Sequence, residues 1–443
     1  MANKVSNNRI IAWGLVIFTL IACLVILAIY LSQRTVGPVG PSSEGGVIFG
    51  SSTGSGSFGS GSSGATEITP PNDDDPESFP RLRKLVNGPV AGAQPITRLN
   101  GSIIVRYVDG RQGDVYELDM RESEPIRLSS RKILGIHDAL WSPDGRSVII
   151  RYVDTTAGFD SVFAYSVLDV YQTSSTSSPD GTIFATGVEE ISMSPFSSRA
   201  AYLQGSFDQR YLFAQNLDTT NNTYLYSPPM SEVQIQWVKD DLLALTTNAS
   251  NNIDGFLYFL SPDANELDKM LSEQGLQTLV SPDGSSVLYS THSRSKNALY
   301  LKDLSGGTTT NLALVSLPEK CTWSPVSREV IYCGVPRSFG SQPQPDAWYQ
   351  GLTSFGDNIF VINTNTMTEG LVEDIYGNFG ADIDIVDPSI DEGGVYLFFI
   401  DKKDRSLWSY QLKETLPTVF EMDSEPMDME MEDATSSEGD VAS

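Results

Sequence analysis

Few residues of this 443-residue chain have the types and spacing that catalysis requires. Residues 50–54 fit the pattern G-x-S-x-G of a hydrolase nucleophile, and residues 54–59 fit the dinucleotide-binding pattern G-x-G-x-x-G. Both patterns work only between a strand and a helix, which aim the serine or the helix dipole. The surrounding segment is rich in glycine and serine and predicts neither element, so we assign no chemistry to either match.

The histidines and cysteines do not form a recognisable metal site. The chain has two histidines, His137 and His292, and no pair of cysteines or histidines has the close spacing of a zinc site. The sequence also places no serine or cysteine nucleophile beside either histidine. We therefore predict no catalytic residue, no metal and no cofactor, and a protein that is not an enzyme.

Two cysteines, Cys321 and Cys333, flank a short predicted hairpin over residues 323–331. In an oxidising compartment such a pair can form a disulfide. A shift of one residue in strand register decides whether their side chains meet or lie on opposite faces. The sequence leaves a disulfide and two buried thiols as alternatives, and we take the disulfide as the candidate.

The strongest pattern in the chain is a repeated turn. Residues 141–145 read WSPDG, SPDG recurs at 281–284, and the shorter WSP stands at 323–325. Proline fixes a backbone dihedral, aspartate hydrogen-bonds to backbone amides and glycine tolerates positive φ, so each copy predicts a tight turn between antiparallel strands. Because the aspartate recurs with the turn, we interpret it as a turn-forming residue; a catalytic group is needed once per site.

Alignment of these units on the strand that follows each turn gives seven equivalent anchor positions. They are spaced 45, 52, 44, 43, 43 and 63 residues apart, at Ile96, Trp141, Met193, Trp237, Val280, Trp323 and Val386. A period of about 40 to 45 residues with several short strands per unit is typical of a β-propeller, whose blades are four-stranded sheets. We predict an all-β, seven-bladed propeller over residues 80–416, with six or eight blades as alternatives because two gaps are irregular.

The last unit contains only three predicted strands, over residues 383–386, 395–400 and 407–412. Residues 82–86 precede the first anchor and resemble the last strand of a blade. They can supply the missing strand and close the ring, which removes exposed sheet edges that would invite aggregation.

An uncharged apolar run of 22 residues, 10–31, follows the polar residues 1–9. As a helix it spans about 33 Å, enough to cross a hydrocarbon core of about 30 Å. Lys4 and Arg9 favour a cytoplasmic N-terminus, because basic residues are retained inside. The alternative is a lipoprotein signal at Cys23, although the residues after it stay apolar. We predict a single-pass protein of the cell membrane with an extracytoplasmic propeller.

Two further segments predict disorder. Residues 32–79 are rich in glycine, serine and proline and contain too few apolar groups to offset the entropy of ordering, which predicts a flexible linker. Residues 417–443 predict an acidic disordered tail, since 421–443 contain nine acidic and no basic side chains. The net charge of the chain is −27, which excludes nucleic acid as a partner, because phosphate backbones are repelled.

The sixth unit carries an insertion of about twenty residues between Gly334 and Asn358. It contains Trp348, Tyr349 and Phe355, and aromatic side chains supply much of the energy at protein interfaces. We predict that these three residues bind a partner. The alternative is that the insertion folds over its own blade and buries them.

The WSPDG, SPDG and WSP sequences resemble the WD40-like (PD40) repeats of TolB-type propellers, found in bacterial envelope proteins and in propeller domains of some peptidases. The resemblance covers about residues 80–416 and implies a propeller used as a binding platform. We therefore predict a membrane-tethered platform that binds another envelope protein. The alternative is an enzyme or carbohydrate-binding propeller with a site in the central channel. Clustered carboxylates with a dry pocket at the channel mouth would favour the alternative, and a broad aromatic face around Trp348 would favour the platform.

Overall fold

The computed structural model describes residues 79–129, 133–154, 162–169, 182–206, 209–230, 232–262, 266–293 and 296–412. The predicted anchor, most of the linker and the acidic tail lie outside these ranges and stay predictions. Within the ranges, no helix has the length and apolar character needed to span a bilayer.

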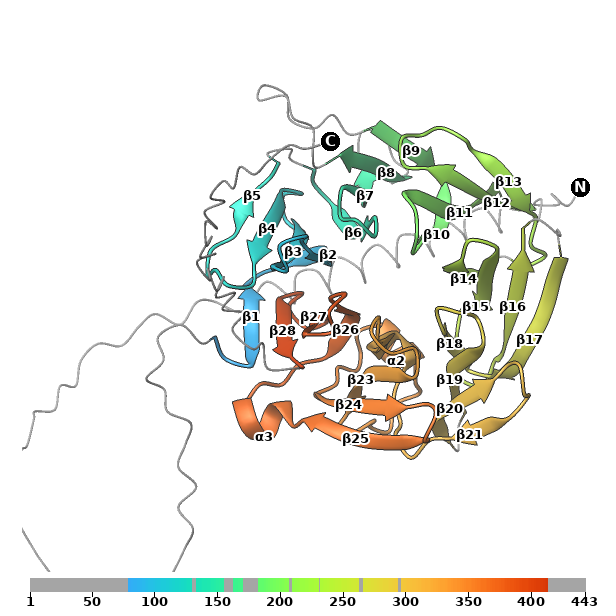
Figure 1. Cartoon of the computed structure of the whole chain (residues 1–443). Coiled ribbons are helices and arrows are strands. Elements are labelled where there is room, and N and C mark those ends of the chain that lie inside the picture. The colour runs from blue at the N-terminus through green and yellow to red at the C-terminus, as the bar shows by residue number, and fades with distance from the viewer. Residues whose placement is uncertain are drawn as a thin grey trace, which may run out of the picture. The chain divides into compact units, whose positions relative to one another are not determined.

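The described strands form seven antiparallel sheets of four strands each, arranged as the blades of a ring (Figure 1). The prediction of an all-β propeller is therefore confirmed.

The bounds of the strands follow the blades in chain order. Blade 1 contains β2 (Val90–Thr97), β3 (Ile103–Asp109), β4 (Val115–Asp119) and β5 (Ile126–Arg127). Blade 2 contains β6 (Ile136–Trp141), β7 (Ser147–Asp154), β8 (Val162–Asp169) and β9 (Thr182–Thr186). Blade 3 contains β10 (Val188–Met193), β11 (Arg199–Ser206), β12 (Gln209–Asn216) and β13 (Thr223–Tyr226). Blade 4 contains β14 (Val233–Lys239), β15 (Leu242–Thr247), β16 (Asp254–Ser261) and β17 (Glu266–Gln274).

Blade 5 contains β18 (Gln277–Val280), β19 (Ser286–His292), β20 (Asn297–Asp303) and β21 (Thr309–Asn311). Blade 6 contains β22 (Cys321–Trp323), β23 (Val330–Pro336), β24 (Asp357–Asn363) and β25 (Thr368–Glu373). Blade 7 contains β26 (Ile385–Ile390), β27 (Tyr396–Asp401), β28 (Leu407–Gln411) and β1 (Leu82–Val86). Three short helices lie in or beside blade 6: η1 (Pro318–Lys320), α2 (Asp346–Tyr349) and α3 (Ile375–Phe379).

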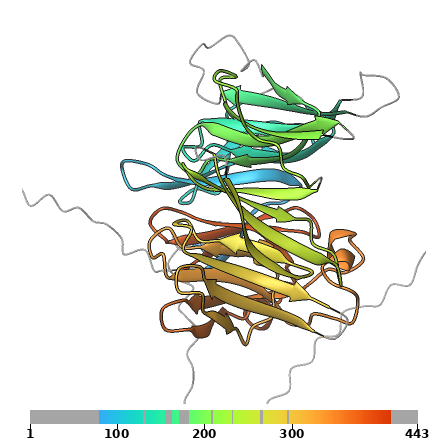
Figure 2. The ribbon, with the colours of Figure 1, turned by 90° about the vertical axis from the view of Figure 1, so that its right-hand side faces the viewer.

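Blade 7 joins the two ends of the propeller. Leu82 of β1 pairs with Tyr410 of β28, and Lys84 pairs with Trp408. The side view shows the blue N-terminal strands beside the red C-terminal ones (Figure 2). The predicted closure by residues 82–86 is confirmed, and it gives β28 a hydrogen-bonded neighbour in place of an open edge.

The repeated turn holds the first hairpin of a blade through side-chain hydrogen bonds. In blade 2, Ser142 Oγ donates to Asp144 Oδ1 at 2.6 Å and accepts from the amide of Ser147 at 2.9 Å. Gly145 follows with a φ of 64°, a conformation that glycine adopts without a Cβ penalty. The aspartate therefore forms the turn, as the sequence indicates.

The apolar core is divided among the contacts between neighbouring blades. One buried cluster, for example, joins Val108 and Val115 of blade 1 to Val148 and Ile150 of blade 2. Blades 1 and 7 meet in another, which includes Phe398. Burying each such side chain contributes about 1.5–3 kcal/mol, so every blade depends on both neighbours for its stability.

Candidate functional site

The first strands of the blades lie near the centre of the ring, where most of them contact the first strand of the next blade and β18 contacts η1 (Figure 1). Because these strands all enter the ring from the same end, residues at their beginnings meet at one end of the central channel. We call this the entry end of the channel. Its polar side chains come from the starts of β6, β10, β14 and β18 and from η1, which precedes β22.

A hydrogen-bonded group lies at the entry end between blades 5 and 6. Gln277 Nε2 donates to Glu319 Oε1 at 3.0 Å and to the hydroxyl oxygen of Tyr349 at 2.6 Å. The Tyr349 hydroxyl in turn donates to Glu319. Burial raises the pKa of Glu319, while the hydrogen bonds from Tyr349, Gln277 and Gln234 oppose the rise. These amide, hydroxyl and carboxyl groups can both donate and accept hydrogen bonds.

Gln277 is held in this orientation by residues of β19. Ser290 Oγ donates to Gln277 Oε1 at 3.0 Å, and His292 Nε2 lies 3.2 Å from the same oxygen. His292 is fully buried, and burial lowers its pKa to about 4, so the ring is neutral at physiological pH. With its oxygen engaged, Gln277 presents its amide nitrogen to Glu319 and Tyr349.

Further carboxyl groups face the same space from blades 2 and 3. Burial raises the pKa of Glu190 to about 7; the charge of Arg151 lowers it, and those of Asp138 and Glu319 raise it. Burial also raises the pKa of Asp138, and the negative charge of Asp387 adds to the rise. Groups from four blades therefore act on one another electrostatically across the channel.

Asp387, on β26, is balanced by a neighbouring cation. Arg405 Nη1 lies 3.6 Å from Asp387 Oδ2. The entry end thus combines several carboxyl groups with two guanidinium groups, those of Arg405 and Arg151. In the described part of the chain, no group of three or more histidine, cysteine, aspartate or glutamate side chains could hold a metal ion.

A cavity of about 270 Å³ opens beside this group. Its lining comes from β14, β15, β18, η1, β22 and β26 and includes Gln234, Gln236, Thr246, Thr278, Glu319 and Asp387. The polar part of the wall shares Glu319 and Asp387 with the groups that meet at the entry end, and apolar residues such as Ile235 and Leu279 complete the lining.

The insertion of blade 6, residues 337–356, packs across the neighbouring blades. Asp346, at the start of α2, accepts hydrogen bonds from Ser250 Oγ at 2.8 Å and from the amide of Asn251 at 2.6 Å. Phe339 stacks on His292 with ring centroids 5.9 Å apart. The insertion therefore reaches from blade 6 past blade 5 to the β15–β16 loop of blade 4. This path places Tyr349, at the end of α2, beside the channel.

The burial of the insertion corrects the predicted contact surface. Trp348 is 3% exposed and Phe355 is 2% exposed, and both belong to the apolar cluster between blades 1 and 7. Trp348 Nε1 also donates to Asp384 Oδ2 at 3.1 Å. These two side chains pack within the propeller, as the alternative interpretation proposed, because the insertion folds back over its own scaffold. Tyr349, which is 40% exposed, differs from them.

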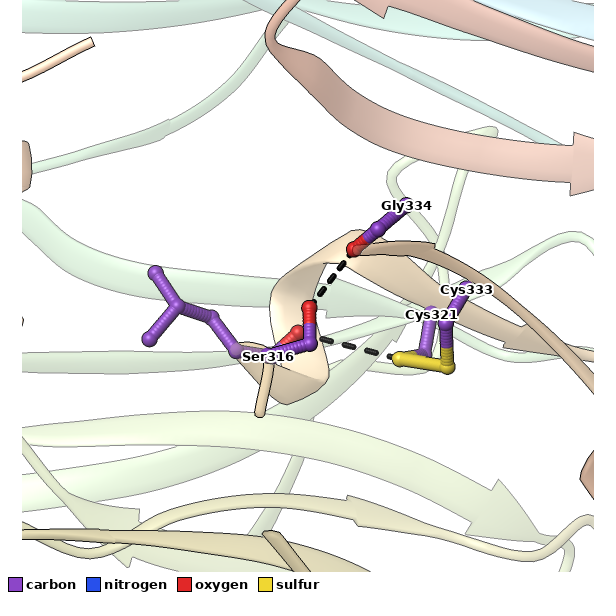
Figure 3. The surroundings of a disulfide bond; sticks show 5 residues. Ser316, Cys321, Cys333 and Gly334 are labelled. Atoms are coloured by element: carbon purple, nitrogen blue, oxygen red, sulfur yellow. Dashed lines mark hydrogen bonds between the residues drawn. A yellow bond between two sulfur atoms is a disulfide. The ribbon is translucent and has the colours of Figure 1, made fainter. Parts of the chain in front are cut away.

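The candidate disulfide is present, between Cys321 of β22 and Cys333 of β23 (Figure 3). The two residues are direct partners in the strand register, with Cα atoms 4.0 Å apart, so their side chains lie on the same face. Ser316 Oγ donates to the carbonyl oxygen of Gly334 beside it, at 2.6 Å. The register thus resolves the choice that the sequence left open.

The residues that line the entry end carried no recognised motif, but they occupy equivalent positions. Asp138, Glu190, Gln234 and Gln277 each stand three residues before the anchor of their unit. Reading that column of the repeat would have revealed a set of polar residues at the start of successive first strands. In the sixth unit, Lys320 stands three residues before the anchor, and Glu319 stands one residue earlier.

No protein-family model matches the sequence, and no curated protein matches it significantly. An oligogalacturonate lyase in complex with manganese shares the fold with a TM-score of 0.51 at 11% identity, covering 75% of this chain and 93% of that chain. TolB from Acinetobacter baumannii gives a TM-score of 0.40 at 12% identity, covering 59% of each chain. The β-propeller domain of the Trilobed protease from Pyrococcus furiosus gives 0.47 at 10% identity, covering 75% of this chain and 98% of that chain.

The first of these comparisons corrects the prediction that the protein is not an enzyme. That prediction rested on the lack of a recognised motif in a repeat scaffold. An oligogalacturonate lyase, which is an enzyme, has the same fold. A propeller of this kind therefore gives no argument against catalysis, and function has to be argued from the site.

Proposed function

We propose that the propeller binds a neutral, polyhydroxylated ligand of the oligosaccharide class at the entry end of the channel. The observation that carries this proposal is the convergence of amide, hydroxyl and carboxyl groups from several blades around a cavity of about 270 Å³. By the criterion drawn from the sequence, clustered carboxyl groups at the channel mouth favour a ligand site over an aromatic docking face.

The hydrogen-bonding character of the site fits a sugar. Gln234, Gln277 and Tyr349 carry groups that donate and accept, as do the hydroxyls of an oligosaccharide. Because burial raises the pKa values of Glu190 and Glu319, these side chains hold protons more readily than ordinary carboxyl groups and can donate as well. Small-molecule sites use a few placed polar groups of this kind for orientation.

Charge argues against two other ligand classes. The carboxyl groups of the site, those of Asp138, Glu190, Glu319 and Asp387, outnumber its two guanidinium groups. The site therefore offers few cationic partners to a polyanion, and oligogalacturonate, named for the similar lyase, fits it poorly. A polycation would be repelled by the guanidinium groups of Arg151 and Arg405. The carboxyl groups would attract it only weakly, because their raised pKa values reduce their negative charge.

Glu190 also gives the site a proton donor that works near neutral pH, since its pKa is raised to about 7. Cleavage of a glycosidic bond needs a proton donor and a second carboxyl group. Hydrolysis of the bound saccharide is therefore the reaction class that we propose for this site.

Calorimetric titration of the full-length protein with neutral cello-, malto- and xylo-oligosaccharides, oligogalacturonate and spermine tests the ligand class. We expect binding of a neutral saccharide, and at least a tenfold loss of affinity, about 1.4 kcal/mol, in Gln234→Ala and Glu190→Ala. Gln209→Ala, on the exposed part of blade 3, is the control and should bind normally. Binding only of oligogalacturonate or spermine, no binding of any of them, or normal affinity in both site variants would refute the proposal.

We further propose that the propeller acts outside the cytoplasm, tethered by residues 10–31. The uncharged run and the basic residues before it support this placement. The Cys321–Cys333 disulfide supports it independently, because disulfides persist in oxidising compartments and are rare in the cytosol.

Binding of an envelope protein is a second candidate function, favoured by the exposed apolar residues of the insertion. Leu352 is 72% exposed, and Tyr349, three residues earlier, is 40% exposed. Leu352→Asp should reduce proximity labelling of a specific membrane-associated partner. Leu371→Asp is a matched control, since Leu371 is 56% exposed on β25 of the same blade. Equal labelling in both variants would place any partner elsewhere on the ring.

A further inference from the structure

A lysine without any exposure to solvent lies between two aspartates in blade 6. The side chains of Lys320, Asp357 and Asp384 are each 0% exposed. Lys320 Nζ lies 2.6 Å from Asp357 Oδ2 and also donates to Asp384 Oδ1. Two carboxylates and one ammonium would leave a net negative charge in the protein interior, which is costly without compensation.

The two aspartates differ in how their oxygens are satisfied. Asp384 uses both: Oδ1 accepts from Lys320, and Oδ2 accepts from Trp348 Nε1 at 3.1 Å and from the amide of Phe355 at 2.9 Å. Asp357 uses one, since Oδ2 also accepts from the amide of Ile385 at 2.7 Å. The buried Oδ1 of Asp357 has no hydrogen-bond partner among the described residues.

Aromatic rings enclose the lysine. Lys320 Nζ lies 5.2 Å from the ring centroid of Trp348 and 5.2 Å from that of Phe355. The insertion therefore separates the three charged side chains from bulk water. Burial raises the pKa of Asp357 to about 6, so this carboxyl group is protonated more easily than an exposed aspartate.

We propose that Lys320 and Asp357 condense to form an intramolecular amide cross-link. The Lys320 ammonium passes a proton to the Asp384 carboxylate, and the free amine attacks the carboxyl carbon of protonated Asp357. The new bond joins Nζ to Cγ, and the Cγ–Oδ1 bond breaks. Oδ1 leaves as water with its own proton and the second proton of the amine, and Asp384 keeps the first, so atoms and charge balance without any oxidant or co-reactant.

The geometry selects Asp357 as the electrophile and Asp384 as the base. The departing oxygen has to take up a proton from the amine to leave as water, and Asp357 Oδ1, which no other group of the described residues hydrogen-bonds, is open to that proton. Asp384 is held in place by Trp348 and Phe355 and remains beside the amine. The reaction also replaces buried charges by a neutral amide, which removes part of their desolvation cost.

The cross-link would join η1, at the entry to blade 6, to β24, the third strand of the same blade. It would lie next to the Cys321–Cys333 disulfide, which joins the first and second strands. Three strands of the blade that carries the insertion would then be linked covalently.

The intact mass of the purified full-length protein, measured after reduction of the disulfide, tests the cross-link directly. We expect the wild type to be lighter than its sequence by the mass of one water molecule. We expect the full sequence mass in three variants: Lys320→Arg, which removes the amine, Asp357→Ala, which removes the electrophile, and Asp384→Asn, which removes the base. A wild type at its full sequence mass overturns the proposal, and this result does not depend on whether any variant folds.

Tryptic digestion after reduction locates the bond. A linked Lys320 is not cleaved, so peptide 303–328 should remain attached to peptide 338–402, which contains both aspartates. Fragmentation should place the link on Asp357; a link on Asp384 would overturn the assignment. In Asp357→Asn the same attack would release ammonia in place of water, a mass change that a structural ion pair could not produce.

Discussion

Glu190 illustrates how the surroundings of one position in the repeat set the acidity of its side chain. It stands three residues before the anchor of its unit, as Asp138, Gln234 and Gln277 do in theirs. At the entry end of the channel, where loss of solvent is the largest effect on it, its pKa rises to about 7. Lys320 occupies the same position in blade 6 but lies between two aspartates in the interior, away from solvent. Equivalent positions therefore support different chemistry, depending on what the neighbouring blade and the insertion place beside them.

The raised pKa of Glu190 predicts a pH-dependent effect of Glu190→Gln on stability. The folded state binds the proton of Glu190 between about pH 4.5 and pH 7, whereas the unfolded chain releases it, so this residue destabilises the fold as pH rises. We expect the free energy of unfolding of Glu190→Gln, relative to wild type, to increase between pH 5 and pH 8 by on the order of 2 kcal/mol.

Urea unfolding at several pH values measures this difference. The variant has to be compared with the wild type at each pH, because His292 also makes stability depend on pH, with the opposite sign. Its pKa is lowered to about 4, so the stability that it contributes is lost as pH falls below about 6.5. Glu189→Gln changes the adjacent, exposed carboxyl group and serves as the control. A pH-independent difference for Glu190→Gln would show that the channel does not perturb this group.

At the scale of elements, blade 6 is the most elaborated part of the ring. It holds the disulfide, the Lys320 cluster and the insertion whose helix α2 reaches the β15–β16 loop. It also packs against blade 7, where β1 completes the last sheet. The candidate site therefore lies beside blade 7, the blade that β1 completes. Pairing of β1 with β28 thus also stabilises the blades that line the entry end.

Deletion of residues 80–87 tests the role of β1. The change removes the ladder between β1 and β28 and the buried side chain of Leu82, which leaves β28 with an open edge. We expect a lower melting temperature and concentration-dependent aggregation. Differential scanning calorimetry and light scattering measure both. Removal of an equal length of the acidic tail, residues 436–443, is the control, and an unchanged melting temperature on loss of β1 would contradict the closure.

At the scale of the whole molecule, we expect a propeller held at a distance from the membrane by a flexible tether. The predicted linker, residues 32–79, would span on the order of 35–40 Å root-mean-square, using about 5–6 Å times the square root of the residue number. The net charge of the whole chain, −27, would disfavour its contact with anionic surfaces.

Protease added to intact spheroplasts tests the orientation. We expect digestion of the linker or propeller and protection of a tag at the N-terminus, because Lys4 and Arg9 favour a cytoplasmic location for that end. Immunoblotting with antibodies to each end detects the fragments, and permeabilised cells control for protease access. A protected propeller would reverse the orientation.

Features that depend on short stretches of chain could be predicted from the sequence. The SPDG turn is built from the side chains of Ser142 and Asp144 and from the φ of Gly145, all within a few residues, so its chemistry can be read directly. The spacing of these turns indicates blades, and the strand missing from the last unit indicates the pairing of residues 82–86.

Contacts between residues that are distant in the chain became known from the three-dimensional structure. Gln277, Glu319 and Tyr349 form one hydrogen-bonded group because the ring brings the start of β18, η1 and the insertion to the same end of the channel. The burial of Trp348 depends on how the insertion folds back against blades 1 and 7, and no local pattern records that path. Closure of the ring and the path of a long loop are set by packing over the whole molecule, whereas turns and strands are set by neighbours in sequence.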